Sequence, residues 1–529
     1  MLALLSACLQ ILIFPRAPLN FLCWIAVTPL LYALLRGRGG EGALSDSEGR
    51  SLRPFTLLQG FMIGWVCGTI WSMGSCYWIV SVMHGYGNVN WMLSVLIMLA
   101  FCLILGMHQG AFGLLVVWMG RRSSAGNRRP LLLAPFFWVA IEFFRDRVTP
   151  VPWDPLGNSQ INNIPFTRIA EFTGVYGLSF AIILVNCAFA GALLLPGGRR
   201  RLNLLISATA AAIALQMGVS AKPGPFATTK EAVLVQPNIP IPDPKQLTDE
   251  YYDRLLLEQT QLSVTAKAKN PPGSPGLIVW PESPVSFADS DPKLRQSLAA
   301  MAQATNSYLI VGVTGTADNR STGGQFQSFN SALVLDPHGN DVGRYDKIHL
   351  VPFGEYVPLR DLLFFARKLT REVGEFSRGT ERKVFDLNGD KVAIAICYES
   401  IFPEEVREFS ANGAQVLVNI SNDTWFGESG APYQHLDMTR MRAIEAHRWV
   451  LLSTNNGITA SIDPYGRIVK RAQRNTQTAL VAPYAPQVET TFYVRYGDLF
   501  AWICVVISCL ALLVRARIPA GTMLEARTT

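Results

Sequence analysis

Charged residues are scarce in this chain, and their scarcity limits the class of protein that it can be. Of its 529 residues, 16% are Asp, Glu, Lys or Arg, while 50% are hydrophobic. An average soluble domain has about 25% charged residues. The composition therefore excludes an ordinary soluble protein and predicts a membrane protein with a large extramembrane domain.

Runs without any charge mark the predicted membrane helices, because a helix needs about 20 apolar residues to cross a bilayer. Residues 55–83 and 174–198 carry no charge, and residues 91–120 carry only His108, so each predicts a span. Five weaker candidates bring the expected number to eight: residues 2–14, 18–35, 130–144, 203–219 and 499–514. The first of these lacks the basic leader and the cleavage site of a signal peptide, so we expect a retained helix.

Lysine and arginine are missing from the loop at residues 84–90, whereas arginines gather in alternate loops. They are Arg36, Arg38, Arg50 and Arg53, then Arg121, Arg122, Arg128 and Arg129, then Arg199, Arg200 and Arg201. Basic loops remain in the cytoplasm. We therefore expect both termini there and the long polar region outside, in the periplasm of a bacterium. The net charge of +7 reflects this topology, and a nucleic-acid partner is not expected.

The positions of the predicted membrane helices also predict the domains. Residues 1–220 hold seven membrane helices, residues 221–496 form one extramembrane domain of ordinary size, and residues 497–529 hold the eighth helix and a cytoplasmic tail. Helical patterns recur in the extramembrane part at residues 249–268, 293–305 and 435–447. Its short apolar segments predict strands, namely EAVLVQPN, GLIVWPES, SYLIVGVTG, SALVLDPHGN, KVAIAICYES, AQVLVNISND, WVLLSTNNG and TASIDPYGR. Helices that alternate with strands predict an α/β fold.

The extramembrane region has one cysteine, Cys397, because the other eight lie in predicted membrane segments. Without a second cysteine in its domain it has no disulfide partner there. Its place at the end of the strand KVAIAICYES leaves two interpretations, a buried inert thiol or a nucleophile. His349 and His435 have no metal-ligand spacing with other residues, so we expect neither a metal nor another cofactor.

Two ionisable residues at other segment ends match the needs of a reactive thiol. Glu282 closes GLIVWPES, and Lys347 follows a turn, with Glu355 eight residues later. Considered singly, Glu282 could be a cap or a surface carboxylate, and Lys347 a solvated charge. Considered together, they offer a base for the thiol proton and a positive donor for an oxyanion. We predict Glu282 as the base, Lys347 as the oxyanion donor and Cys397 as the nucleophile.

The motifs WPES, YDKIHLVPFGEYVP and CYE, in this order, resemble those of the nitrilase superfamily. With the predicted spans and with FPRAPLNFLCWIAVTPLL, PWDPLGNSQI and SNDTWFG, nearly the whole chain resembles the apolipoprotein N-acyltransferase family of bacterial inner membranes. This resemblance implies a four-layer α-β-β-α extramembrane domain. The family's catalytic glutamate, lysine and cysteine correspond to Glu282, Lys347 and Cys397.

The resemblance also implies the supporting residues and the reaction. A second glutamate corresponds to Glu355, the residues after the cysteine to Tyr398 and Glu399, and an aromatic on a loop over the site to Trp425, for which a membrane-interface anchor is the alternative. The family takes an acyl chain from a phospholipid, typically phosphatidylethanolamine, and holds it as a thioester. It then acylates the α-amino group of the diacylglyceryl-cysteine that begins a diacylated apolipoprotein.

Two other functions fit parts of the sequence. A membrane-anchored amidase or nitrilase-type hydrolase would use the same three residues with water as the acceptor of the acyl group. A transporter or scaffold would carry the extramembrane domain as an inactive binding module. The hydrolase differs from the acyltransferase in that water reaches the thioester. The transporter or scaffold does not explain why the three catalytic residue types stand at their motif positions.

Overall fold

The structure is a computed structural model of the whole chain, and it divides into two compact units. The helical unit comprises Met1–Tyr77, Val95–Lys222 and Asp498–Thr529, and the sheet unit comprises Trp78–Ser94 and Pro223–Gly497. The structure describes residues 1–15, 19–36, 55–87, 89–121, 129–149, 151–195, 198–221, 223–241, 244–269, 276–282, 287–319, 325–356 and 376–517. Five arginines that set the predicted orientation lie outside these residues: Arg38, Arg50, Arg53, Arg122 and Arg128.

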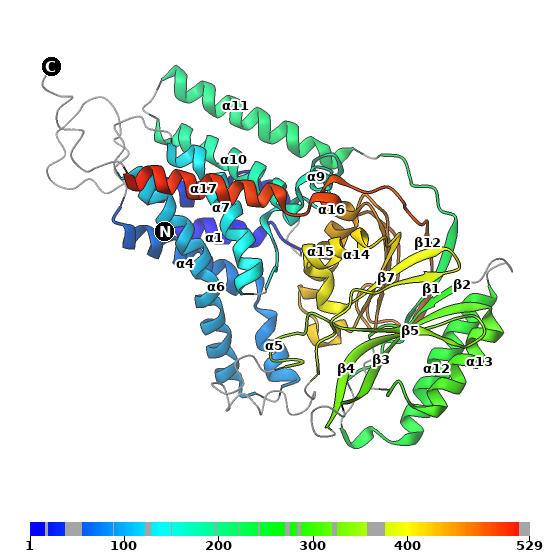
Figure 1. Cartoon of the computed structure of the whole chain (residues 1–529). Coiled ribbons are helices and arrows are strands. Elements are labelled where there is room, and N and C mark those ends of the chain that lie inside the picture. The colour runs from blue at the N-terminus through cyan, green and yellow to red at the C-terminus, as the bar shows by residue number, and fades with distance from the viewer. Residues whose placement is uncertain are drawn as a thin grey trace, which may run out of the picture. The chain divides into compact units, whose positions relative to one another are not determined.

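The helical unit is a bundle of α-helices joined by short 3-10 turns (Figure 1). Its elements are α1 (Leu2–Leu12), η1 (Asn20–Leu22), α2 (Cys23–Ala26), α3 (Thr28–Arg36), α4 (Leu57–Ser75), α6 (Trp91–Gly120), α7 (Arg129–Val148), η2 (Leu156–Gln160), α8 (Ile164–Thr167), α9 (Ala170–Thr173), α10 (Val175–Leu194), α11 (Arg199–Gln216), η3 (Met217–Ser220) and α17 (Leu499–Arg517). Among the described residues, four helices are long and apolar enough to cross a membrane: α6, α10, Arg199–Ser220 and α17. These four correspond to predicted spans.

The uncharged stretch at residues 55–83, predicted as one span, is two helices in the structure. The helix α4 ends at Ser75, and α5 (Trp78–Gly85) continues at an angle of 53° to it. The two helices have different partners. The Ser75 hydroxyl donates to Asp154 within the helical unit at 2.7 Å, while the Trp78 ring packs against Phe426 of the sheet unit. Hydropathy alone could not reveal the break, because both helices are apolar.

Small residues let the helices of this unit approach each other closely. A Cβ added to Gly64 of α4 would come within 2.1 Å of the Gln109 carbonyl oxygen of α6, and one added to Gly113 of α6 would meet the Gly60 carbonyl oxygen at 2.3 Å. Such contacts are the usual means of helix association in membranes. A polar link ties α10 to α3, because the Asn186 side-chain oxygen accepts from the backbone N–H of Thr28 at 2.9 Å.

The sheet unit contains two sheets of six strands each. The first has the order β12-β1-β2-β3-β4-β5, and the second has the order β11-β10-β9-β8-β7-β6. The strands are β1 (Lys230–Gln236), β2 (Gly276–Val279), β3 (Ser307–Asn319), β4 (Gln325–Leu335), β5 (Asp341–Asp346), β6 (Val384–Leu387), β7 (Asp390–Ile396), β8 (Val416–Ser421), β9 (Trp449–Thr454), β10 (Ala460–Ile462), β11 (Ile468–Arg471) and β12 (Thr478–Tyr484). Parallel pairing joins β1 to β2, β2 to β3, β7 to β8 and β8 to β9.

Side chains of both sheets meet in one apolar core. It contains Leu234 and Val279 of the first sheet together with Ile394 and Val418 of the second. A second core lies between the first sheet and two helices, α12 (Asp249–Ala268) and α13 (Pro292–Thr305), which run side by side in Figure 1. The remaining helices are α14 (Pro403–Ala411), α15 (Ala431–Ala446) and α16 (Phe492–Tyr496), and α14 and α15 contact β7 and β9 of the second sheet.

All eight predicted strands are confirmed, and so are the three predicted helices, which are α12, α13 and α15. The helix α15 begins at Ala431, four residues before the predicted start, because Pro432 occupies the first turn. The strands that the sequence did not predict are β5, β6, β11 and β12. The α/β interpretation of the extramembrane part is therefore correct.

Candidate active site

The three residues predicted to act together follow strands of the two sheets. Lys347 comes directly after β5, Cys397 comes directly after β7, and Glu282 lies three residues beyond β2. All three are buried, with exposed fractions of 1% for Lys347 and 8% for the other two. The Lys347 Nζ lies 3.3 Å from Glu282 Oε1, and the charges of both residues act on the Cys397 thiol. The structure thus brings the three side chains into one site.

Lys347 is held between two carboxylates. Its Nζ lies 2.9 Å from Glu355 Oε1 as well as near Glu282, and the Asn330 amide donates to the same oxygen of each glutamate at 2.6 Å. The other Glu355 oxygen accepts from the backbone N–H of Val351. Burial alone would lower the pKa of Lys347, but the two carboxylates outweigh it and raise that pKa. The lysine is therefore a fixed positive charge.

Cys397 stands at a sharp turn between β7 and a 3-10 helix, η7 (Cys397–Ile401). Its φ is +51°, a left-handed conformation that costs a non-glycine residue energy. Three side chains bond to its carbonyl oxygen: Ser400 at 3.1 Å, His435 at 3.1 Å and Asn419 at 3.2 Å. Such bonds stabilise the strained turn and fix the direction of the side chain.

Burial and neighbouring charges act on the pKa of the Cys397 thiol. Burial raises the pKa of Cys397 well above its usual value, Glu282 adds to the rise, and Lys347 opposes it. A thiol of this kind needs a base close by at the moment of attack. The second oxygen of Glu282 is held by the Asn422 backbone N–H at 2.9 Å, so the position of this carboxylate is fixed.

Glu399 is fully buried and accepts four hydrogen bonds. One oxygen accepts from the Tyr345 hydroxyl and from the backbone N–H groups of Ile348 and His349, and the other accepts from the Ile396 N–H. These donors belong to β5, to the segment that carries Lys347 and to the last residue of β7. Glu399 therefore ties the turn of the cysteine to the segment of the lysine.

Tyr398 and Trp425 lie beside these residues but are less buried. The Tyr398 ring packs edge-on against Phe402 at 5.2 Å between centroids. Trp425 belongs to η8 (Asp423–Phe426) and packs edge-on against Tyr86 at 5.5 Å. Tyr86 also donates to the Thr424 carbonyl oxygen at 3.0 Å, so the segment after α5 holds the loop of Trp425.

Sequence reasoning missed four polar residues that the structure places around the reactive groups: Asn330, Ser421, Asp423 and His435. Ser421 and Asp423 belong to the quoted motif SNDTWFG, so the motif itself was a signal. His435 has no metal-ligand spacing in the sequence, and its contact with the Cys397 carbonyl oxygen depends on the packing of α15. Asn330 gave no signal, because a polar residue within a strand is ordinary until its partners on other strands are known.

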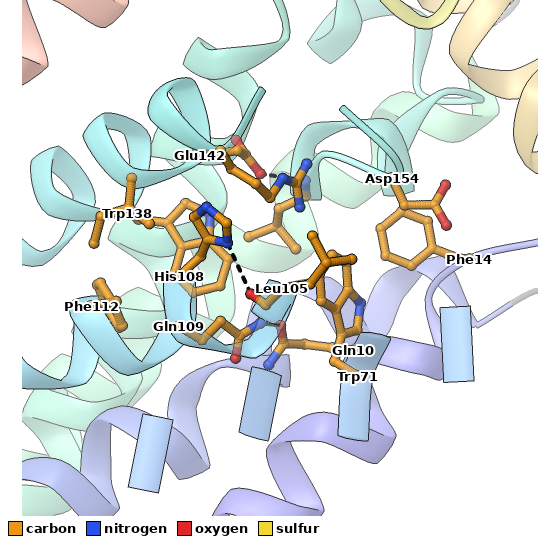
Figure 2. A pocket seen from close by; sticks show the side chains of 13 residues that line it. Gln10, Phe14, Trp71, Leu105, His108, Gln109, Phe112, Trp138, Glu142 and Asp154 are labelled. Atoms are coloured by element: carbon orange, nitrogen blue, oxygen red, sulfur yellow. Dashed lines mark hydrogen bonds between the residues drawn. The ribbon is translucent and has the colours of Figure 1, made fainter. Parts of the chain in front are cut away.

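A cavity within the helical unit is a separate feature (Figure 2). It has a volume of about 40 Å³, and polar groups of Gln10, His108, Gln109, Glu142 and Asp154 border it. One Glu142 oxygen accepts from the Leu156 N–H at 2.9 Å. None of the predicted site residues lines the cavity, and its volume suits a few water molecules and no acyl chain.

Comparison with known proteins connects both parts of the chain. Residues 234–491 match the family model of the carbon-nitrogen hydrolases, and residues 6–188 match that of the apolipoprotein N-acyltransferase N-terminal domain. The chain is 34% identical over 518 residues to an apolipoprotein N-acyltransferase of Geobacter metallireducens, with 96% of this chain and 93% of that protein covered. It is 33% identical over 491 residues to one of Pseudomonas aeruginosa, with 88% and 86% covered.

Among solved structures, Nit3 of Saccharomyces cerevisiae, a member of the nitrilase superfamily, aligns with 51% of this chain and 94% of its own, at 20% identity and a TM-score of 0.37. The family models and the site define the class: a carbon-nitrogen hydrolase domain joined to membrane helices. The chain belongs to the apolipoprotein N-acyltransferase family. It is therefore an N-acyltransferase.

Proposed function

We propose that this enzyme transfers a fatty acyl chain from a membrane phospholipid to the α-amino group of the S-diacylglyceryl-cysteine that begins an apolipoprotein, through a thioester on Cys397. The observation that carries the proposal is the buried group of Cys397, Lys347 and Glu282. A thiol, a fixed cation and a carboxylate are the groups that acyl transfer requires. Family membership agrees with lipoproteins as the acceptors.

In the first half of the reaction, Glu282 takes the thiol proton, and the Cys397 sulfur attacks the ester carbonyl carbon of the phospholipid. Lys347 and the backbone N–H of Tyr398 stabilise the oxyanion. The intermediate collapses with loss of the lysophospholipid alkoxide, which receives the proton from Glu282. The products of this half are a lysophospholipid and an acyl thioester on Cys397.

In the second half, the α-amino group of the acceptor attacks the thioester, Glu282 takes the amine proton, and the Cys397 thiolate leaves and is protonated. The enzyme returns to its starting state, so the kinetics should be ping-pong. Glu355 holds Lys347 in place, and Glu399 fixes the turn of the cysteine. The loop of Trp425 limits the access of water to the thioester, which would otherwise hydrolyse.

The proposal includes the arrangement in the membrane. Both substrates are anchored by acyl chains, so the reactive thiol must lie close to the headgroup plane of the bilayer. We propose eight spans with both termini in the cytoplasm of a bacterium and residues 221–496 as the catalytic domain on the periplasmic side of the inner membrane. The four-layer α-β-β-α order is proposed for that domain, and phosphatidylethanolamine is the proposed donor.

The test uses the purified full chain with a phospholipid labelled in its acyl chain and a synthetic diacylated lipopeptide. We expect labelled N-acyl peptide and, without the peptide, a hydroxylamine-sensitive acyl adduct on Cys397 by mass spectrometry. Cys397→Ser should lose both products. Cys509→Ser, which changes an exposed cysteine of α17, is the matched control and should keep them. Free fatty acid without N-acyl peptide would show a hydrolase instead.

A further inference from the structure

A chain of polar contacts leaves the Cys397 side chain and returns to its backbone. Ser421 ends β8 beside Cys397, because the preceding residues Ile420 and Ile396 pair in the parallel strands β8 and β7, and Ser421 lowers the pKa of the thiol through a side-chain hydrogen bond. The Ser421 hydroxyl donates to Asp423 Oδ1 at 2.7 Å. The same oxygen lies 3.4 Å from His435 Nδ1, an ion-pair distance, and His435 Nε2 bonds to the Cys397 carbonyl oxygen at 3.1 Å. All four residues are buried, Ser421 completely.

His435 joins Asp423 to the turn of the cysteine. Its Nδ1 lies 3.4 Å from Asp423 Oδ1, and its Nε2 lies 3.1 Å from the Cys397 carbonyl oxygen and 3.0 Å from the Ser400 hydroxyl oxygen. The imidazole therefore connects the carboxylate that accepts the Ser421 hydrogen with the backbone of the cysteine.

Ser421 has one hydroxyl hydrogen and two neighbours that can accept it. While Cys397 is a thiol, its S–H can donate to Ser421 Oγ, and the Ser421 hydrogen goes to Asp423. Once the thiol has lost its proton, the sulfur is a charged acceptor with no donor of its own. A serine hydroxyl rotates freely enough to change acceptors without any movement of the backbone.

Resting on the proposed role of Cys397 as nucleophile, we propose that Ser421 is a further catalytic residue, whose hydroxyl turns from Asp423 to the sulfur when the thiolate forms. Asp423 and His435 are positioning residues that hold the hydroxyl and the cysteine turn. In this step the S–H bond breaks, the proton goes to Glu282, and no other covalent bond changes. The reverse turn occurs when the sulfur forms the thioester.

The charged and titratable groups around the sulfur come from four elements. Glu282 follows β2, Lys347 follows β5, Asp423 follows β8, and His435 lies on α15. Lys347 favours the thiolate, whereas Glu282 and Asp423 oppose it. Ser421 supplies a donor to the thiolate that brings no net charge to the site. It therefore stabilises the sulfur anion and leaves Glu282 effective as a base. A second cation in its place would make Glu282 a weaker base.

The test measures the thiolate directly, as the rate at which iodoacetamide alkylates Cys397 in the full chain between pH 6 and pH 10, followed by mass spectrometry of the Cys397 peptide. Ser421→Ala should slow alkylation at neutral pH by roughly 10- to 100-fold, the usual effect of a hydrogen bond to a charged group, and move the profile to higher pH. Asp423→Asn should act in the opposite direction and speed alkylation, because it removes a negative charge.

The matched control is Ser453→Ala on the neighbouring strand β9. Ser453 is as buried as Ser421, and its hydroxyl donates to the Val235 carbonyl oxygen at 3.0 Å, away from this chain of contacts. Its alkylation rate should stay within about twofold of the wild type. Equal rates for both serine variants would overturn the proposal, and so would slower alkylation in Asp423→Asn, which a merely structural role predicts.

Failure of the proposed function would look different. In that case the wild type would form no acyl adduct from labelled phospholipid, although the alkylation profiles would still separate Ser421→Ala from Ser453→Ala. Conversely, a normal acyl adduct with identical alkylation in both serine variants would retain the acyltransferase and remove Ser421 from its mechanism.

Discussion

Replacing Glu399 with glutamine should make the stability of the protein less sensitive to pH between about 4.5 and 7. The carboxyl group has no exposed surface, and burial raises its pKa from 4.5 to about 7. The folded state therefore binds this proton more tightly than the unfolded state does. Its contribution to stability is complete below pH 4.5 and is lost as the pH rises through 7.

The structure gives the size of this effect. The gap between 4.5 and about 7 corresponds to roughly 3 kcal/mol, at 1.36 kcal/mol for each pH unit. Glutamine cannot titrate, so the variant loses the pH-dependent part. It also turns an N–H₂ group toward at least one of the four donors around Glu399, which costs about 1–3 kcal/mol at every pH. The wild type should thus have its largest advantage at low pH.

Thermal unfolding of the sheet unit in detergent, at four pH values from 4.5 to 7.5, measures the difference. The Tm advantage of the wild type over Glu399→Gln should shrink by roughly 6–12 °C across this range, at about 2–4 °C per kcal/mol. Glu381→Gln changes a carboxylate whose side chain is 72% exposed and should track the wild type throughout. Parallel curves for the wild type and Glu399→Gln would refute the argument.

Three further outcomes follow from the contacts of the site. Lys347→Met leaves two buried carboxylates without their cation, so it should lower the free energy of unfolding by about 3–5 kcal/mol in denaturant titration and abolish the acyl adduct. Asn330→Leu removes the amide that donates to both Glu282 and Glu355, and it should slow formation of the acyl adduct at least about tenfold. As a control, iodoacetamide should still alkylate Cys397 in this variant. Gly457→Ala places a Cβ 2.0 Å from Asp423 Oδ2 and should destabilise the protein by about 1–3 kcal/mol, read as a lower Tm.

The strands that the sequence did not predict are the four edges of the two sheets: β5, β6, β11 and β12. An edge strand has a neighbour on one side only; β11 is largely exposed and β5 has one buried residue, so their apolar pattern is weak. Central strands are buried on both faces and appear in the sequence as continuous apolar runs. Hydropathy therefore predicts the middle of each sheet and misses its margins.

The site shows a similar division. Glu282, Lys347 and Cys397 could be predicted because each stands at or near a strand end and their chemistry is complementary. The partners of these groups could not be predicted in the same way. Asn330 lies within a strand, and His435 reaches the cysteine from a helix 38 residues later. Their roles depend on tertiary contacts, which the order of residues does not contain.

The break between α4 and α5 has a consequence for dividing the molecule. The sheet unit consists of two pieces of chain, Trp78–Ser94 and Pro223–Gly497. The chain between these two pieces, Val95–Lys222, belongs to the helical unit. A soluble fragment cut at Pro223 would lose Trp78 and Tyr86, the rings that pack on Phe426 and Trp425. The sheet unit is thus discontinuous in sequence, and its loop of Trp425 is completed by a piece of chain that lies 338 residues earlier, as counted between Tyr86 and Thr424.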